Sequence, residues 1–198
     1  MDHSITIHLI RHAPTVSNLQ QRYIGWTDEP LADVEALVPI DPTLTEVFGS
    51  DLLRCKQTAK GYFPHAIYVE NKALREMHFG DFECKSYEEL KDIAAYRRWI
   101  DHPFTSQPPN GESFQAFQTR VMEGYRTTFK GQDQVFVVHG GVIRVLLMHL
   151  APDEKDFWDW SVPHGVVFSL TWQNIDQIKE GLRCTSLSVE PITASGSL

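Results

Sequence analysis

The sequence predicts an α/β fold, a three-layer α/β/α sandwich in which helices cover both faces of a mainly parallel sheet. Apolar, strand-like runs alternate along the 198 residues with segments of helical periodicity, as is typical of this class. The run at residues 5–10 is β-rich and nearly uncharged, as expected of a buried central strand. Residues 134–138 form a second apolar run, and a histidine lies at or near the end of each.

The first half of the chain contains two further predicted strands and one helix. Residues 46–49 and 66–69 have the composition of short strands. Ser50-Asp51 supplies residue types favoured at helix N-caps, so a helix is expected over residues 52–62. Residues 30–45 contain three prolines, and any helix there must be short because proline interrupts the helical hydrogen-bond ladder.

The second half continues the alternation. Ser86-Tyr87-Glu88-Glu89 has the pattern of a capping box, from which a helix should run to about Trp99. Ser113 opens another helix, whose aromatic stripe is more typical of a core than of a cofactor site. The remaining expected elements are a helix at 142–150, late strands at 166–172 and 182–189, antiparallel at a sheet edge, and a small-residue tail at 193–198.

Length and composition indicate one folded domain. A chain of 198 residues that is 42% apolar suits a single domain over residues 1–198. Within it, we expect residues from about 63 to 111 to form a partial cap over the functional site. The net charge of −8 argues against non-specific nucleic-acid binding. The negative net charge is still compatible with an anionic small-molecule substrate, because a few arginines in a cleft create a local positive field.

Cysteine usage and hydropathy indicate a cytoplasmic protein with no membrane partner. The three cysteines, Cys55, Cys84 and Cys184, are far apart and odd in number, which favours reduced thiols. No apolar stretch approaches the length that spans a bilayer. The first residues also lack the basic segment and apolar run of a signal peptide.

Arg11-His12 and His139-Gly140 follow the two apolar runs. If the runs are neighbouring parallel strands, both histidines lie at the edge of the sheet where open α/β folds have their active sites. A neutral imidazole nitrogen can attack phosphorus when the other nitrogen's proton is held by an acceptor, which makes His12 the candidate nucleophile. His139 could hydrogen-bond the transferring phosphoryl group. The alternative is that these are strand-end histidines without a chemical role.

Two arginines are suited to binding the transferring phosphoryl group. The guanidinium groups of Arg11 and Arg54 can match phosphoryl oxygens with two hydrogen bonds and keep their charge. Arg54 lies early in its predicted helix, whose N-terminus adds a favourable field for an anion. The alternative for Arg54 is an ordinary helical ion pair with Asp51.

Glu76 is the candidate proton donor. Its carboxyl group could protonate the departing alkoxide and then take a proton from the attacking water. The alternative is a surface ion pair with Arg75, and Glu83, Glu88 and Glu89 are competing candidates for the same role.

No metal or cofactor is expected. The histidines, cysteines and carboxylates do not have metal-ligand spacing. The glycines form neither a dinucleotide-binding nor a Walker-type loop. A Gly-x-Ser-x-Gly elbow is missing too, which disfavours a serine hydrolase of the α/β type.

The order of these motifs resembles the histidine phosphatase superfamily, also called phosphoglycerate mutase-like, from about Ile7 to Phe168. The resemblance implies that His12 becomes phosphorylated, that Arg54 binds phosphate and that Glu76 is the proton donor. The candidate phosphate-binding residues are then Arg11, Thr15, Asn18, Arg54, His139 and Gly140.

Within the superfamily, residues 76–83 and 109–117, followed by Arg120-Val121, are similar to the α-ribazole phosphatases. That branch implies removal of the 5′-phosphate from α-ribazole phosphate during cobalamin nucleotide-loop assembly, without a metal. The alternatives are a broad-specificity small-molecule phosphatase, a phosphoglycerate mutase and an inactive phosphate-binding module.

The chain departs from the family pattern in four places. Ala13 and Pro14 stand where the family has mostly Gly and often Glu, and we expect the small Ala13 to leave the phosphate pocket open. Cys84 occupies a usual glycine position, which could alter its loop. Residues 31–45 are proline-rich and shorter than in the family, which bears on the first helix and not on the catalytic motifs.

Overall fold

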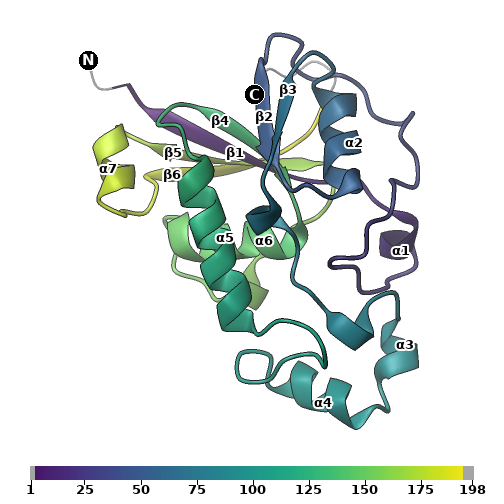
Figure 1. The fold of residues 1–198 in the computed structure, drawn as a ribbon. Helices are drawn as coiled ribbons and strands as arrows, with labels where there is room; N and C mark the ends of the chain where they lie inside the picture. The colour runs from purple at the N-terminus through teal and green to yellow at the C-terminus, as the bar shows by residue number, and fades with distance from the viewer. Residues whose placement is uncertain (1–2, 194–198) are drawn as a thin grey trace.

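The computed structural model describes residues 3–193 and has the expected α/β sandwich around a six-stranded sheet of order β3-β2-β4-β1-β5-β6 (Figure 1). The first four strands along the chain are parallel to one another, whereas β5 pairs antiparallel with β1 and β6 pairs antiparallel with β5. The strands are β1 (Ile5–Arg11), β2 (Glu46–Gly49), β3 (Ile67–Glu70), β4 (Gln134–Val138), β5 (Val166–Trp172) and β6 (Ser186–Pro191).

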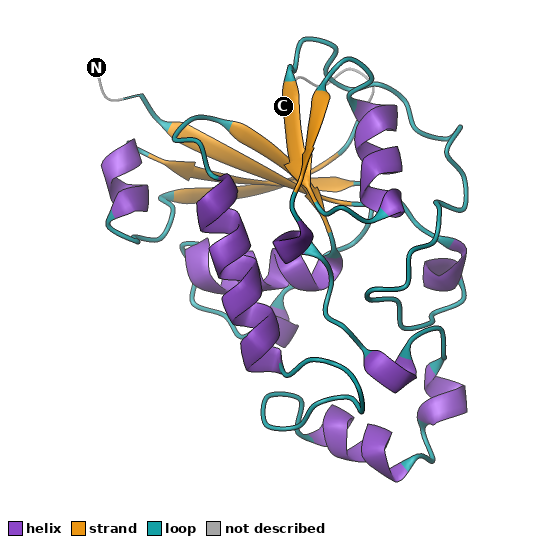
Figure 2. Cartoon of the chain, viewed as in Figure 1, coloured by secondary structure: helices purple, strands orange, loops and turns teal. Residues whose placement is uncertain are grey.

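Helices cover both faces of this sheet, as Figure 2 shows. The α-helices are α1 (Val16–Leu19), α2 (Leu53–Tyr62), α3 (Tyr87–Leu90), α4 (Ala94–Asp101), α5 (Phe114–Thr128), α6 (Gly140–Leu150) and α7 (Ile175–Lys179). Three short 3-10 turns are η1 (Lys72–Leu74), η2 (Gly80–Phe82) and η3 (Phe157–Asp159).

Strand β4 shows how the layers form. Its side chains alternate between the two faces, as strand geometry requires. Val135 and Val137 pack in the cluster that includes α2, and Phe136 and Val138 pack in the larger cluster with α5 and α6. All four residues are buried. The two clusters make the sheet the central layer of a sandwich, with α2 on one side and α5 and α6 on the other (Figure 1).

The parallel pairing of β1 with β4 positions the candidate site. Arg11 lies opposite Val138 in the register of the two strands. The pairing continues one residue further, because the His12 N–H donates to the Val138 carbonyl at 2.9 Å. His12 and His139 therefore leave the sheet side by side, as expected from the two strand ends.

Helix α2 is capped differently from the sequence prediction. It begins at Leu53, and the preceding Leu52 makes no side-chain capping bond. The Leu53 N–H donates instead to the Asp28 carboxylate at 2.7 Å, across a long sequence separation. Asp51 is unavailable because it forms a two-point ion pair with Arg75. The predicted local cap at Ser50-Asp51 was thus replaced by a tertiary one.

The prediction of a single helix from Ser86 to about Trp99 is wrong. Helix α3 ends at Leu90, and a second helix, α4, begins at Ala94. The capping box of Ser86 with Glu89 is present. In one continuous helix, Tyr96 and Trp99 would lie roughly 120° and 180° around the axis from Leu90. All three side chains are buried in one cluster with Phe82, which a straight helix could not achieve.

Several smaller boundaries also differ. Helix α6 begins at Gly140 instead of 142, and β6 spans 186–191 instead of 182–189. The short helices α1 and α7 were not expected. Residues 31–45 contain no helix, which agrees with the expectation that any helix there must be short. The tail expected at 193–198 lies almost wholly outside the described residues.

The range proposed as a partial cap, residues 63–111, includes β3 and therefore part of the sheet. Its later part, from η2 through α4, has a small apolar cluster of its own and lies away from the sheet (Figure 1). The role of this part as a cap stays a prediction. None of the helices in the described part of the chain is long and apolar enough to cross a bilayer.

Cys84 shows how the chain accommodates one departure from the family pattern. Its φ is 62°, in the left-handed region that favours glycine. The loop keeps this conformation because the Cys84 N–H donates to the Tyr23 carbonyl at 2.7 Å. Holding a side chain there costs roughly 1–2 kcal/mol, so glycine is the better residue at this position.

Candidate active site

His12 is a buried histidine with one defined tautomer. It is 3% exposed, and its Nδ1 lies 2.7 Å from the carbonyl oxygen of Ala13. A carbonyl oxygen can only accept, so Nδ1 carries the proton and Nε2 keeps its lone pair. Burial, followed by the charge of Arg54, holds the pKa of His12 well below its usual value. The ring is therefore neutral and has a free lone pair on Nε2, as a nucleophilic histidine requires.

His139 lies against His12, with ring centroids 5.2 Å apart, and is fully buried. Burial, followed by the charge of Arg54, also lowers the pKa of His139 well below its usual value. Cys55 of α2 has its sulfur 3.5 Å from the Nε2 atom of His139. Burial raises the pKa of the Cys55 thiol to about 12, so the sulfur keeps its proton and can donate to Nε2. The ring proton of His139 would then reside on Nδ1.

Arg11 and Arg54 supply the positive charge of the site. Arg54 is fully buried, and Arg11 donates to the Val162 carbonyl at 2.7 Å. Among residues 3–193, neither guanidinium Nε has a hydrogen-bond partner. A buried guanidinium with an unused donor is costly in a folded protein unless an anion can complete its coordination. The ion pair of Arg54 with Asp51 is ruled out, because Asp51 binds Arg75.

The loop before residue 30 holds Arg54 in place, which the sequence did not reveal. Arg54 donates to the carbonyl of Thr27 at 2.9 Å and to that of Gly25 at 2.6 Å. Glu83 holds the same loop, accepting from the backbone N–H of Trp26 at 2.8 Å and of Thr27 at 2.6 Å. Glu83 is therefore committed to a structural role and is a poor candidate for the proton donor.

Glu76 reaches the start of helix α6 and stays free of Arg75, its alternative partner. Its Oε2 accepts from the Gly141 N–H at 2.8 Å, and its Oε1 accepts from the Met77 N–H at 2.9 Å. A Cβ on residue 141 would lie 2.1 Å from Oε1, so only glycine permits this approach. Glu88 and Glu89, the other competitors, pair with Lys91 and Arg22 on an exposed surface.

Thr15 and Asn18 bind each other. The Thr15 hydroxyl accepts from the Asn18 backbone N–H at 3.2 Å, and the side-chain oxygen of Asn18, Oδ1, accepts from the Thr15 backbone N–H at 3.1 Å, forming the capping box of α1. The amide nitrogen of Asn18 takes no part in this box, and its role in binding phosphate stays a prediction. A Cβ on Gly140 would lie 3.3 Å from the Arg11 guanidinium carbon, so Gly140 does sit beside the charged part of the site.

A cavity of about 420 Å³ opens beside Glu76 and Gly141. Its charged lining residues are Glu76 and Arg144, and the Arg144 guanidinium lies 5.6 Å from the ring centre of Trp158. Phe114 and Phe117 also line it, so part of the stripe assigned to the core borders the site. The other aromatic lining residues are Tyr23, Phe79, Trp99, Phe157 and Trp158.

His164 is a neighbour of the site that the sequence motifs did not identify. Its Nδ1 donates to the backbone carbonyl of His12 at 2.6 Å, and the two ring centres lie 5.6 Å apart. The only local signal is its position in Pro163-His164-Gly165 directly before β5. Only the antiparallel pairing of β5 with β1 brings it to His12.

The chain belongs to the histidine phosphatase superfamily (branch 1), whose family model matches residues 7–184. The site described above lies within that range, with His12 and His139 at the ends of β1 and β4, Arg11 at the end of β1 and Arg54 in α2. The expected resemblance is thereby confirmed.

The relatives include proteins that are named for two different activities. An adenosylcobalamin/alpha-ribazole phosphatase from Salmonella typhimurium is 29% identical, with 85% of this chain and 88% of that protein covered. A 2,3-bisphosphoglycerate-dependent phosphoglycerate mutase 2 from Gloeobacter violaceus is 28% identical, with 75% and 78% covered.

Solved structures show the same fold. A protein from Thermus thermophilus has a TM-score of 0.68 at 31% identity, covering 92% of this chain and 98% of its own. The alpha-ribazole phosphatase from Shigella flexneri has a TM-score of 0.75 at 23% identity, covering 98% and 99%.

The lowered histidine pKa values predict that stability falls with acidification. Burial, followed by the charge of Arg11, lowers the pKa of His164 from 6.5 to about 4. The unfolded chain then binds more protons than the folded one below pH 6.5, so the free energy of unfolding is highest above that pH and decreases towards pH 4. Each histidine contributes at most about 1.4 kcal/mol per pH unit.

Urea unfolding between pH 7.5 and pH 4.5 checks this prediction. His164→Asn, which retains an N–H donor, should show a shallower decrease than the wild type. His65→Asn is the matched control, because His65 is exposed, and its curve should parallel that of the wild type. Equal slopes for the wild type and His164→Asn would contradict the expected effect.

Proposed function

We propose that the chain is a phosphomonoesterase that works through a phosphohistidine at His12. The observation that carries the proposal is the neutral, buried His12 with its Nδ1 proton held by Ala13, beside His139 and two arginines. These groups match a nucleophile and a set of donors for the charge on a phosphoryl group.

In the first half-reaction, Nε2 of His12 forms a bond to phosphorus while the bond to the leaving oxygen breaks. Arg11, Arg54 and His139 stabilise the charge on the phosphoryl oxygens. Glu76, in its protonated form, gives its proton to the leaving oxygen, so the alcohol departs neutral. Its carboxyl group lies at the Gly141 N–H, where the cavity begins.

In the second half-reaction, water attacks phosphorus and the N–P bond breaks. Glu76, now ionised, takes a proton from the water, and inorganic phosphate leaves. The cycle returns His12 with its proton still on Nδ1 and Glu76 in its protonated form. This scheme draws only on side chains of the site, and we propose that no cofactor takes part.

We propose further that the substrate is α-ribazole 5′-phosphate. Support comes from the relatives named alpha-ribazole phosphatase and from the aromatic cavity on the leaving-group side of Glu76. α-Ribazole is a nucleoside with a planar, apolar benzimidazole base, which suits stacking against aromatic side chains. The cytoplasm is the compartment we propose for this activity.

Phosphoglycerate mutation is the second candidate, because mutases also occur among the relatives. A phosphoglycerate carries a carboxylate besides its phosphate, and such a group favours several cations. The cavity offers Arg144, which already donates to the Trp160 carbonyl at 2.9 Å and packs on aromatic rings. We therefore place the mutase second.

A phosphate-release assay without added metal tests the proposed function. The panel compares α-ribazole 5′-phosphate with ribose 5-phosphate, nucleotides and 3-phosphoglycerate. We expect a preference for α-ribazole 5′-phosphate that His12→Ala abolishes while the circular dichroism spectrum stays native. Broad, weak and His12-dependent release would retain the mechanism and remove the cobalamin assignment. Isomerisation faster than release would favour the mutase, and full activity of His12→Ala would refute the mechanism.

Trp158 provides a separate test of the substrate. It is 53% exposed and lines the cavity, so its ring is available to a planar base. An aromatic contact contributes about 0.5–1.5 kcal/mol, so Trp158→Ala should raise the KM for α-ribazole 5′-phosphate about 2- to 12-fold. Trp158→Phe should restore most of the loss, and the KM for ribose 5-phosphate should stay unchanged. An equal rise for both substrates would contradict stacking of the base.

A further inference from the structure

The segment that carries Glu76 has no regular secondary structure of its own. Residues 75–79 lie between η1 and η2, outside helix and strand. Backbone groups in such a segment have no ladder to bind to, and each needs another partner once it is removed from water. The partners of this segment decide where the Glu76 carboxyl group lies.

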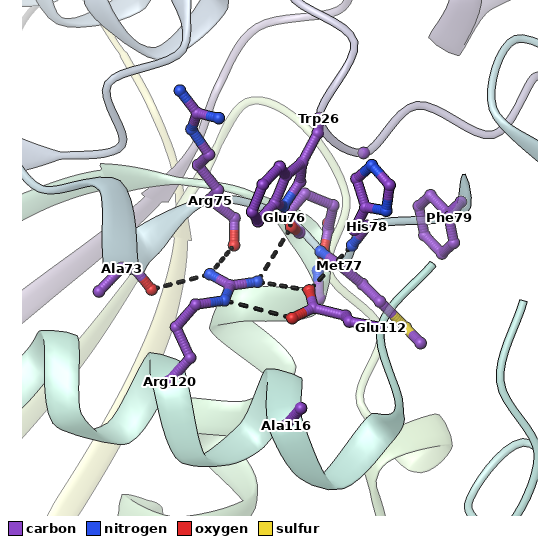
Figure 3. Close-up of polar contacts among 12 residues, drawn as sticks. Trp26, Ala73, Arg75, Glu76, Met77, His78, Phe79, Glu112, Ala116 and Arg120 are labelled. Atoms are coloured by element: carbon purple, nitrogen blue, oxygen red, sulfur yellow. Dashed lines mark hydrogen bonds and ion pairs between the residues drawn. The ribbon is translucent and has the colours of Figure 1, made fainter. Parts of the chain in front are cut away.

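Arg120 of α5 binds three carbonyl groups of this region. Its Nη1 donates to the carbonyls of Ala73 and Arg75, both at 2.9 Å, and its Nη2 donates to that of Glu76 at 3.2 Å. Figure 3 shows the guanidinium reaching from the helix towards these oxygens. One side chain thus holds the backbone on both sides of the proposed proton donor.

Glu112 completes the arrangement. It binds the Arg120 guanidinium at two points, with Oε1 accepting from Nη2 at 2.5 Å and Oε2 from Nε at 3.3 Å (Figure 3). Glu112 also makes two hydrogen bonds with the backbone of His78. Its side-chain Oε1 accepts from the His78 N–H at 2.9 Å, and its backbone N–H donates to the His78 carbonyl at 3.0 Å. The segment is therefore bound before and after Glu76 by one ion pair.

Trp26 packs over this ion pair and adds a further bond. Its indole N–H donates to the Glu76 carbonyl at 3.0 Å, and its ring lies 5.8 Å from the Arg120 guanidinium carbon. The side chains of the pair are 21% and 16% exposed, which shields them from water and salt. The pair has a defined geometry that a solvent-exposed surface pair would lack.

The carboxyl end of Glu76 has little freedom to compensate for movement of its backbone. Its Oε2 accepts a hydrogen bond from the Gly141 N–H, and its Oε1 lies so close to residue 141 that a Cβ atom there would clash with it. A shift of the segment would therefore move the carboxyl group away from the leaving oxygen. Misplacement by about 1 Å can lower a rate about 10²-fold.

We infer that the Glu112–Arg120 ion pair is a positioning device for the proton donor. It contacts no reacting atom and acts by fixing the backbone of residues 73–78, so that Glu76 meets the leaving group. This inference rests on the proposed role of Glu76 as general acid and adds two positioning residues to it.

Leaving-group dependence distinguishes this role from a merely structural one. The departure of an alkoxide, as from ribose 5-phosphate, needs a proton, whereas p-nitrophenolate leaves without one. Arg120→Lys keeps the charge and loses the planar fork. We expect it to lower kcat/KM for ribose 5-phosphate about 10²-fold and kcat/KM for p-nitrophenyl phosphate less than about 3-fold, since general acids contribute about 10²–10⁴-fold. The ratio kcat/KM reports the steps up to departure of the leaving group, so the later reaction of the phosphohistidine with water, which is common to both substrates, does not enter it.

Two further variants make the test decisive. Glu112→Gln, which keeps the shape of the side chain, should show the same selective loss even if Arg120→Lys does not fold. Arg126→Lys is the matched control, because Arg126 is an exposed arginine of the same helix, and it should retain both activities. Thermal unfolding of each variant shows whether the fold persists.

Glu76→Gln, assayed in parallel, separates this inference from the proposed function. Selective loss in Glu76→Gln and in the ion-pair variants supports the inference. Selective loss in Glu76→Gln alone overturns the positioning role and leaves the general acid intact. Equal loss of kcat/KM on both substrates, or no loss, in Glu76→Gln overturns the general acid and the inference with it.

Discussion

The parallel pairing of β1 with β4 is the constraint on which the rest of the site depends. The bond from the His12 N–H to the Val138 carbonyl extends the ladder to the edge of the sheet, so two histidines lie in contact there. Because the strands are buried on both faces, the two rings are buried as well, and burial keeps them neutral. A neutral imidazole with a free Nε2 at His12, as the proposed nucleophile needs, follows from the architecture.

The charges of the site depend on a second set of contacts, made by loops distant in sequence. The carbonyls of Gly25 and Thr27 orient the Arg54 guanidinium, and Glu83 fixes that loop in turn. Helix α6 contributes the Gly141 N–H to Glu76. Loop carbonyls thus place the positive charge, and a helix end places the Glu76 carboxyl group. In the proposed mechanism, this separates the phosphate side of the site from the leaving-group side.

Local sequence patterns predicted the features that depend on neighbouring residues. The strands, the Ser86 capping box and the strand-end histidines were found because periodicity and caps act over a few residues. Long-range contacts were not accessible in this way. The cap of α2 by Asp28, the approach of His164 and the bonds of Arg120 to the Glu76 segment each join distant parts of the chain. The break before α4 arose from a cluster with Phe82, which no local pattern shows.

The identity of the phosphorylated atom tests the central claim most directly. The enzyme would be mixed with excess substrate, quenched in base, and digested for mass spectrometry and ³¹P spectroscopy, with His12→Ala as control. The bond of Nδ1 to the Ala13 carbonyl predicts one phosphohistidine, at Nε2 of His12. Phosphate on Nδ1, on His139 or on His164 would contradict this account. So would turnover that inverts configuration at phosphorus, because a direct attack by water needs no phosphoenzyme.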